Sequence, residues 1–212
     1  MKLLIVGGGS PKTWPDKLTD FDFYIGVDRG SLYLLEAQLP LDLAVGDFDS
    51  LTESERQRVF AKSRAHVQAP AEKDDTDTQL ALLWATQHYP EAQYTCIGLT
   101  GGRIDHFLAN LWMVLEPRFA KFIPQICLLD QQNSIHFYLP GEYTIYREKS
   151  KKYLAYVCLT PMQSLSLYDS KYTLDQQRIT YPIAYASNEF LTNTARFVFS
   201  DGILAVIQSK DA

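Results

Sequence analysis

The stretch Leu43-Ala44-Val45-Gly46-Asp47-Phe48-Asp49-Ser50 carries two aspartates directly after a short apolar run. The run 43–45 has the composition of a buried strand, and the polar residues follow where it ends. Alternate side chains of an extended backbone point the same way, so Asp47 and Asp49 are expected to share one face. Two carboxylates this close repel each other unless a cation lies between them. Taken alone, the motif predicts either a divalent-metal site or a polar turn after a strand.

Residues 1–130 alternate apolar runs with helical patterns. The apolar runs are short and nearly continuous, and they cover residues 2–6, 23–27, 43–45, 66–69, 94–98 and 123–129. Between them, Thr52 and Glu55 have the spacing of a capping box that begins a helix. Farther on, the stripe of Leu80, Leu83 and Trp84 predicts a buried helix face. Continuous apolar strands alternating with helices predict an open, mostly parallel α/β sheet covered on both faces.

The pattern changes beyond residue 130. Short β-rich segments follow one another, at Ile135–Leu139, Tyr143–Arg147, Tyr153–Leu159, Ser164–Tyr168, Arg196–Phe199 and Ile203–Gln208. They are separated by Pro-Gly, Asn-Glu or Asp-Gly turns, which is typical of an all-β sandwich. We therefore expect two domains, an α/β domain over residues 1–130 and a β-sandwich over residues 131–212.

The composition narrows the class of protein. The chain has 212 residues, 46% of them hydrophobic and 21% charged, enough to bury the core of one large or two small domains. A net charge of −5 argues against general nucleic-acid binding. The cysteines, Cys96, Cys127 and Cys158, are scattered in apolar runs and predict buried free thiols in a reducing compartment. No apolar run has the length of a membrane span or a signal peptide, so we expect a cytoplasmic protein.

Aspartates recur where the predicted strands end. Asp28, Asp47, Asp49 and Asp105 each follow an apolar run, and Asp74 and Asp77 precede a helix. Ligands of an open parallel sheet bind beyond the carboxyl ends of its strands, so these carboxylates are expected at one edge. So much negative charge favours Mg²⁺, which proteins hold with few carboxylates together with substrate phosphates. The expected ligand is therefore a polyphosphate, most simply ATP.

Glycine-rich segments offer groups that phosphates bind. Gly101-Gly102-Arg103 combines close backbone approach with a forked cation. His106 follows in the first turn of the next helix, either as a cleft residue or as a capping or packing histidine. Gly7-Gly8-Gly9-Ser10 predicts either contact with a phosphate or a simple turn at the end of a strand.

Successive motifs resemble those of one known family. They are Gly26-Val27-Asp28-Arg29-Gly30, Gly46-Asp47-Phe48-Asp49-Ser50, Lys73-Asp74-Asp75-Thr76-Asp77 and Gly98-Leu99-Thr100-Gly101-Gly102-Arg103-Ile104-Asp105-His106. In this order they resemble the thiamine pyrophosphokinases of bacterial type, and Ser187-Asn188-Glu189 resembles a Ser-Asn turn of that family. The resemblance implies transfer of a pyrophosphoryl group from ATP to the hydroxyl of thiamine with Mg²⁺, giving thiamine diphosphate and AMP. It also implies a homodimer whose thiamine site lies between the α/β domain of one subunit and the sandwich of the other.

The resemblance further implies roles for particular residues. The Mg²⁺ and phosphate-site carboxylates would be Asp47, Asp49, Asp74 and Asp77. The catalytic residues would be Asp49, Asp77, Arg103 and Asp105, with Asp105 orienting the thiamine hydroxyl or accepting its proton. Contacts to the substrates would come from Asp28, Arg29, Gly30, Asp74, Thr76, Gly101, Gly102, His106, Ser187 and Asn188.

The sequence also departs from the family pattern. Lys171-Tyr172-Thr173-Leu174 lacks the glycine found ahead of the Ser-Asn turn. No tryptophan follows Trp112, so a tyrosine is expected to replace a thiamine-stacking tryptophan. Two other functions stay open at this point: a pyrophosphokinase for another hydroxymethyl heterocycle such as a pterin, and a non-catalytic protein that binds thiamine or a nucleotide.

Overall fold

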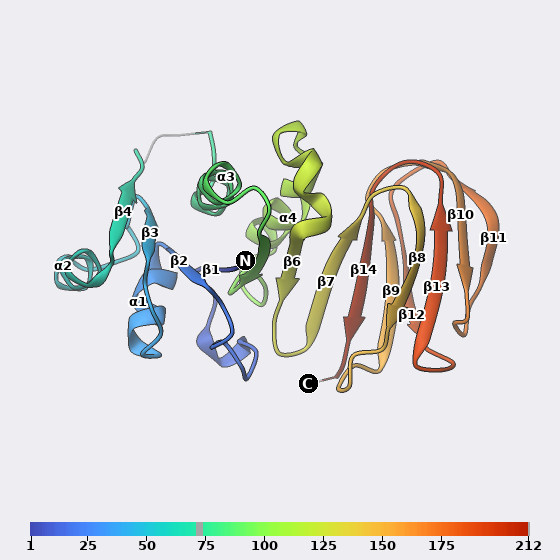
Figure 1. Ribbon diagram of the computed structural model, residues 1–212, viewed down its shortest axis with the longest axis horizontal. Helices are drawn as coiled ribbons and strands as arrows, with labels where there is room; N and C mark the ends of the chain where they lie inside the picture. Colours follow the sequence, from blue (N-terminus) through green and yellow to red (C-terminus); the bar gives the residue numbers. More distant parts are fainter. Residues whose placement is uncertain (71–73, 212) are drawn as a thin grey trace. The chain divides into compact units, whose positions relative to one another are not determined.

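The computed structural model describes residues 1–70 and 74–211, so Lys73 of the third motif lies outside the described residues. The chain divides into two compact units between Gln131 and Gln132 (Figure 1). The first unit is an α/β domain and the second is built of strands. Both parts of the predicted fold class are confirmed.

The α/β unit is organised by a parallel sheet. Its strands are β1 (Lys2–Val6), β2 (Phe23–Val27), β3 (Leu43–Gly46), β4 (Ala65–Gln68), β5 (Gln93–Ile97) and β6 (Ile126–Leu129). Their order across the sheet is β6-β5-β1-β2-β3-β4, with every pair parallel. The side chains of β1 from Leu3 to Val6 are fully buried, as expected for a strand covered on both faces.

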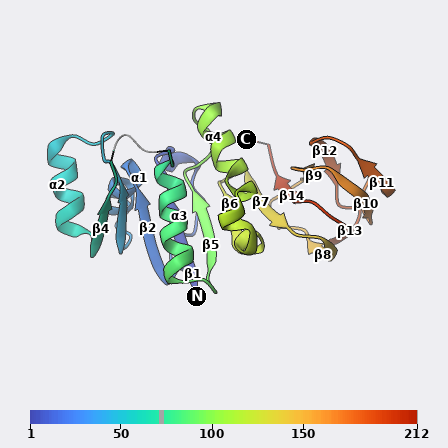
Figure 2. The ribbon, with the colours of Figure 1, turned by 90° about the horizontal axis from the view of Figure 1, so that it is seen from above.

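Helices cover both faces of this sheet. They are α1 (Arg29–Glu36), α2 (Glu53–Lys62), α3 (Asp77–His88) and α4 (Ile104–Trp112), with 3₁₀ segments η1 (Pro11–Thr13), η2 (Met113–Leu115) and η3 (Pro117–Gln125). The chain moves along the sheet in one direction through α1 and α2 and returns in the other through α3. Right-handed crossovers in opposite directions put α1 and α2 on one face and α3 on the other. Figure 2 shows α3 lying along the strands.

The beginnings of two helices are capped as their sequences require. The capping box of Thr52 and Glu55 is present at the start of α2, as predicted, and a second one joins Thr76 and Gln79 at the start of α3. The predicted buried stripe of α3 is wrong: the helix buries Ala81, Leu82 and Ala85 together with Thr78 and Thr86. Small alanines let the helix approach β1, β2 and β3 closely, whereas the bulky Trp84 stacks on Phe23 at the edge of the contact.

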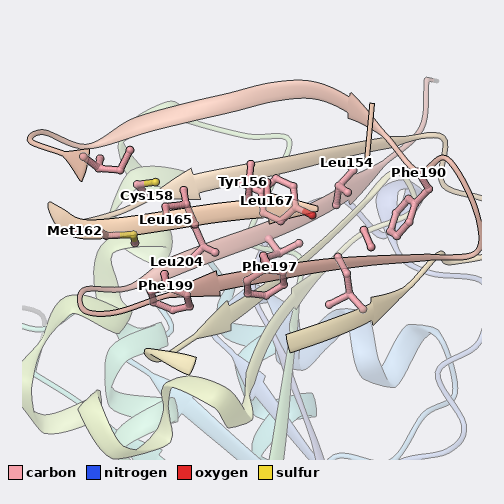
Figure 3. Packing of buried hydrophobic residues seen from close by; sticks show 14 residues of the cluster. Leu154, Tyr156, Cys158, Met162, Leu165, Leu167, Phe190, Phe197, Phe199 and Leu204 are labelled. Carbon is pink, nitrogen blue, oxygen red and sulfur yellow. The ribbon is translucent and has the colours of Figure 1, made fainter. Parts of the chain in front are cut away.

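The second unit is an antiparallel β-sandwich. Its strands are β7 (Asn133–Tyr138), β8 (Gly141–Tyr146), β9 (Tyr153–Cys158), β10 (Met162–Tyr168), β11 (Leu174–Ile179), β12 (Ile183–Glu189), β13 (Thr194–Phe199) and β14 (Leu204–Ser209). One sheet has the order β12-β9-β14-β7 and the other the order β11-β10-β13-β8. Figure 3 shows their facing side chains, with Leu154, Tyr156 and Cys158 of β9 above Phe197 and Phe199 of β13.

Two strands of the sandwich escape the sequence pattern. β11 is polar and largely exposed, so it lacks the alternation that marks a strand. β12 contains Ser187-Asn188-Glu189, which the sequence predicts as a turn; that prediction is wrong. Ser187 has φ +59°, and the pairing of β12 with β9 shifts register between Tyr185 and Asn188. The segment is therefore a β-bulge inside a strand.

The cysteines and the helices bear on two further sequence expectations. All three cysteines are free thiols, with Cys96 and Cys158 buried and Cys127 half-buried. No helix in residues 1–70 or 74–211 is long and apolar enough to cross a membrane.

Candidate active site

A cavity of about 570 Å³ opens beyond the carboxyl ends of β1, β2, β3 and β5. The chain leaves β1 toward one side of the sheet and leaves β5 toward the other, so the cavity lies at the switch point where ligands bind in open α/β folds. Its lining includes Gly8 and Gly9 after β1, Asp28 after β2, Asp47 and Asp49 after β3, and Gly98–Leu99 after β5.

The loop after β3 turns its aspartates outward because it anchors the residue between them. Phe48 is 1% exposed and packs edge-on against Phe60 of α2, with ring centroids 5.0 Å apart. Its φ of +60° lets the backbone reverse around the buried ring. The amide of Asp49 donates to Oδ1 of Asp47 over 3.2 Å. Both carboxylates thus reach the cavity while the phenyl ring fixes the loop.

Asp28 completes a group of three carboxylates. Its Oδ1 accepts a hydrogen bond from the amide of Phe48 over 3.0 Å, which ties the end of β2 to the loop after β3. Gly46, at φ +151°, makes this approach possible, since a Cβ there would lie 2.1 Å from Oδ1 of Asp28. Asp28, Asp47 and Asp49 each offer one oxygen within 4.8 Å of the others. Such a set of hard oxygen donors fits Mg²⁺.

The pKa of Asp28 is raised to about 7. The main cause is burial of the carboxyl group, and the negative charge of nearby Asp77 adds to it. Ionising Asp28 therefore destabilises the fold when no metal is bound. Asp28→Asn keeps the acceptor for Phe48 and removes the charge. In EDTA at pH 8 we expect this variant to be more stable by roughly 1 kcal/mol after allowing for solvent screening, which raises Tm by about 2–4 °C.

The pH dependence of this difference follows from the direction of the shift. Below the ordinary pKa of an aspartate both proteins carry a neutral side chain, so they unfold alike. As pH rises from 4 to about 7 the unfolded chain ionises before the folded one, and the advantage of asparagine grows to a plateau. Thermal unfolding of both proteins across this range measures it. A Tm for Asp28→Asn at or below wild type at pH 8 would contradict the prediction.

Arg29 braces the same loop from the start of α1. Its guanidinium donates to the carbonyl of Ser50 and lies 3.7 Å from a carboxylate oxygen of Glu55. Arg29 also lines the cavity. It is therefore a cation held across the end of the Gly46–Ser50 loop, facing the space where an anionic ligand would lie.

Arg103, directly before α4, pairs with Asp105 in the first turn of that helix. Nε of Arg103 donates to Oδ1 of Asp105 over 3.2 Å, and a second nitrogen donates to Oδ2. These hydrogen bonds lower the pKa of Asp105. The loop that leads into α4 is anchored by Thr100, whose hydroxyl donates to buried Asp130 over 2.6 Å.

The structure gathers most of the predicted site residues around one cavity. Those on its lining are Asp28, Arg29, Asp47, Asp49, Thr76, Asp77, Gly102, Arg103 and His106. Asp74, Gly101 and Asp105 are exposed and lie off the lining, and Asp74 and Asp77 are outside the group of three carboxylates found in the described residues. Gly30 is buried and lets α1 pack closely on the end of β1, because a Cβ there would lie 2.0 Å from the carbonyl oxygen of Val6.

Other lining residues were not predicted as site residues. Gly8 and Gly9 line the cavity, so the first glycine run lies where a phosphate contact would require it. Ser50, Asp75, Thr78 and Asn110 also line it. Ser50 and Asp75 belong to motifs quoted from the sequence, whereas Thr78 and Asn110 are buried helix residues that carry no local signal.

Ser187 and Asn188 lie in the sandwich unit, where they differ sharply in exposure. Ser187 is exposed, but Asn188 is 2% exposed. Oδ1 of Asn188 accepts from the amide of Tyr172 over 2.9 Å, and its Nδ2 donates to the carbonyl of Tyr172 over 2.8 Å. The side chain of Asn188 thus holds the backbone of Tyr172, whose own side chain is 58% exposed.

The chain matches family models over both units. The model described as "Thiamin pyrophosphokinase, catalytic domain" matches residues 15–127. The model described as "Thiamin pyrophosphokinase, vitamin B1 binding domain" matches residues 142–204. Together the two matches cover most of the chain and fall on the two structural units separately.

Individual relatives agree with the family models. A protein of Bacillus subtilis (strain 168) named thiamine pyrophosphokinase is 37% identical, with the whole of both chains covered, and its crystal structure superposes with a TM-score of 0.87. A thiamin pyrophosphokinase family protein from Enterococcus faecalis is 55% identical over the full length of both chains, with a TM-score of 0.97. Because its sequence and its fold both agree with these relatives, this chain belongs to the thiamin pyrophosphokinase family.

Proposed function

We propose that this protein transfers the pyrophosphoryl group of ATP to the hydroxyl of thiamine, giving thiamine diphosphate and AMP. The observation that carries the proposal is the group of Asp28, Asp47 and Asp49, with oxygens within 4.8 Å of one another, beside a cavity lined by glycine loops. Family membership supplies the substrate pair. No feature of the structure favours a pterin substrate or a non-catalytic role.

Asp28, Asp47 and Asp49 would hold Mg²⁺, with Asp77 close enough to Asp28 to add to the negative charge of the site. Bound there, Mg²⁺ would neutralise phosphate charge and polarise the phosphoryl oxygens. The backbone at Gly8 and Gly9 leaves room for the polyphosphate chain to approach the end of β1.

Cations on the lining would act on the phosphates directly. Arg103 is exposed at the cavity and would offset the charge that develops as the pyrophosphoryl group moves. Its partner Asp105 has a lowered pKa and is a weak base, so we assign Asp105 to holding Arg103 and orienting the thiamine hydroxyl. Arg29 and His106 lie on the same lining and would contact the phosphates.

Tyr172 is our choice for the aromatic contact to thiamine. It is exposed, its backbone is fixed by Asn188, and it lies beside the bulge that exposes Ser187. Nζ of Lys171 lies 5.6 Å from the centre of its ring, so one face of the ring already accepts a cation. A thiazolium or aminopyrimidine ring could use this aromatic surface in the same way.

We further propose that the active protein is a homodimer in the cytoplasm, with each thiamine site formed by the α/β unit of one copy and the sandwich of the other. Ile104 and Trp112 of α4 are 74% and 52% exposed, and Tyr146 and Tyr181 of the sandwich are 74% and 63% exposed. Large apolar side chains in the open are typical of surfaces that another chain covers. Free thiols within the described residues suit a reducing compartment.

The test is a product assay with two acceptors. The protein is incubated with Mg²⁺-ATP and either thiamine or a hydroxymethylpterin, and AMP is followed. We expect AMP with thiamine only. AMP with the pterin only would replace the proposed acceptor, and AMP with neither would make the chain a binding protein.

A further inference from the structure

A closed ring of hydrogen bonds surrounds the start of α3. Arg118 of η3 donates from two nitrogens to the carboxylate of Asp75, over 2.8 and 2.6 Å, and its Nε donates to Glu116 over 2.7 Å. The second oxygen of Glu116 accepts from the side-chain amide of Gln79. The side-chain oxygen of Gln79 accepts from the backbone amide of Thr76 over 2.7 Å, which returns the ring to the residue after Asp75.

This ring spans segments far apart in the sequence. Arg118 is separated from Asp75 by 43 positions, and Gln79 from Glu116 by 37. Side chains of Arg118, Asp75 and Glu116 are only 31%, 26% and 29% exposed, so water screens their attraction less than on an open surface. Bidentate pairing of arginine with a carboxylate fixes direction as well as distance.

The ring acts on the segment that carries acidic residues into the cavity. Asp74, Asp75 and Asp77 are three negative charges within four positions, and Asp77 also faces Asp28. Without a cation on this segment, mutual repulsion would push its carboxylates apart. Arg118 neutralises the charge of Asp75 and so weakens this repulsion. Gln79 holds the backbone of Thr76, which fixes the position at which α3 begins with Asp77.

We propose that Arg118 is a positioning residue for pyrophosphoryl transfer, holding the Asp75–Asp77 segment so that Asp77 faces the metal site. The inference rests on the proposed function for its reaction. Arg118 itself is not on the cavity lining, and its hydrogen bonds to the described residues go to Asp75 and Glu116. It works through Asp75 and, by way of Glu116 and Gln79, through Thr76.

The test replaces Arg118 by methionine, which keeps an apolar side chain at this position. It removes the three hydrogen bonds and the guanidinium that lies 5.0 Å from the centre of the Phe119 ring. We expect Mn²⁺, used as the probe for Mg²⁺ and titrated by electron paramagnetic resonance, to bind about 10-fold more weakly or worse, an effect of the size seen when groups that orient a metal site are removed. The Mg²⁺ concentration for half-maximal AMP formation should rise by a similar factor, with KM for thiamine unchanged.

Companion variants separate positioning from stability. Arg118→Lys keeps the charge without the fork and should fall between wild type and Arg118→Met; it also decides the test if Arg118→Met fails to fold. The double variant Asp75→Asn/Arg118→Met should bind Mn²⁺ no worse than Arg118→Met alone, because both changes break the same contact, the Arg118–Asp75 pair. Arg56→Met is the matched control, since Arg56 pairs with Glu53 on the exposed face of α2.

The outcomes distinguish this inference from the proposed function. Lower Tm with unchanged Mn²⁺ affinity in both Arg118 variants would overturn the positioning role and leave a structural one. Absence of AMP with the wild-type protein would overturn the proposed function, while the Mn²⁺ titration would still decide whether Arg118 positions the acidic segment.

Discussion

Asp49→Asn is expected to lower the rate of AMP formation by about a thousandfold or more, because it removes a charge from the centre of the proposed metal site. Asp49 is exposed and offers one of the three oxygens that lie within 4.8 Å. Asparagine has the same shape but no charge, so phosphate repulsion in the cavity would no longer be offset by a tightly held cation. Rates are measured at saturating Mg²⁺-ATP and thiamine, together with Mn²⁺ binding.

The fold should survive this change. The loop is held by the buried ring of Phe48 and by the backbone amide of Asp49, which donates to Asp47, and neither contact uses the Asp49 carboxylate. Asp16→Asn is the matched control, since Asp16 is exposed in the same unit and away from the cavity. Wild-type turnover in Asp49→Asn, or an equal loss in Asp16→Asn, would show that the metal assignment is wrong.

The sequence predicts those parts of the site whose geometry depends on neighbouring residues alone. Asp47 and Asp49 share a loop, and a spacing of two after a strand was enough to bring them together. The same holds for the sheet, because continuous apolar runs such as Lys2–Val6 leave little choice of structure. Predicting that several strand-end aspartates meet at one edge required only the rule that parallel strands end on the same side.

What sequence reasoning missed depends on contacts between distant residues. Asp28 was expected at this edge and as a substrate contact, but not among the metal ligands. It joins the carboxylate group because its φ of +46° turns it toward Phe48 and because Gly46 leaves space for it. Asp75 looks like its neighbours in the sequence, yet its carboxylate is paired with Arg118, 43 positions later. Neither effect has a local signature.

The sandwich shows the same limit in another form. Asn188 matches a motif residue, but its amide is used inside the unit to hold Tyr172, sixteen positions earlier. Ser187 is exposed because the bulge in β12 gives it a left-handed backbone. A motif identifies the region that binds a ligand, whereas burial and hydrogen bonding decide which of its side chains remains available.

Complementation between two inactive variants would test the proposed dimer directly. Tyr172→Arg puts a positive charge beside cationic thiamine at a position that is 58% exposed, so it should block binding without disturbing the core. Asp49→Asn inactivates the other half of the site. If each site combines the α/β unit of one copy with the sandwich of its partner, a mixed dimer contains one doubly altered site and one intact site.

Co-expression of the two variants should therefore restore about a quarter of wild-type activity, since about half of randomly assembled dimers are mixed and each has one working site. Mixed dimers purified through two different tags should reach about half. Asp49→Asn co-expressed with the double variant Asp49→Asn/Tyr172→Arg is the matched control and should stay inactive, because no copy then supplies Asp49. A monomer, or a dimer whose sites each lie within one copy, gives no recovery in either mixture. Restored activity in the first mixture alone requires that residues from two copies meet in one site. That is the arrangement we propose for the carboxylate group and Tyr172, which belong to different units of the chain.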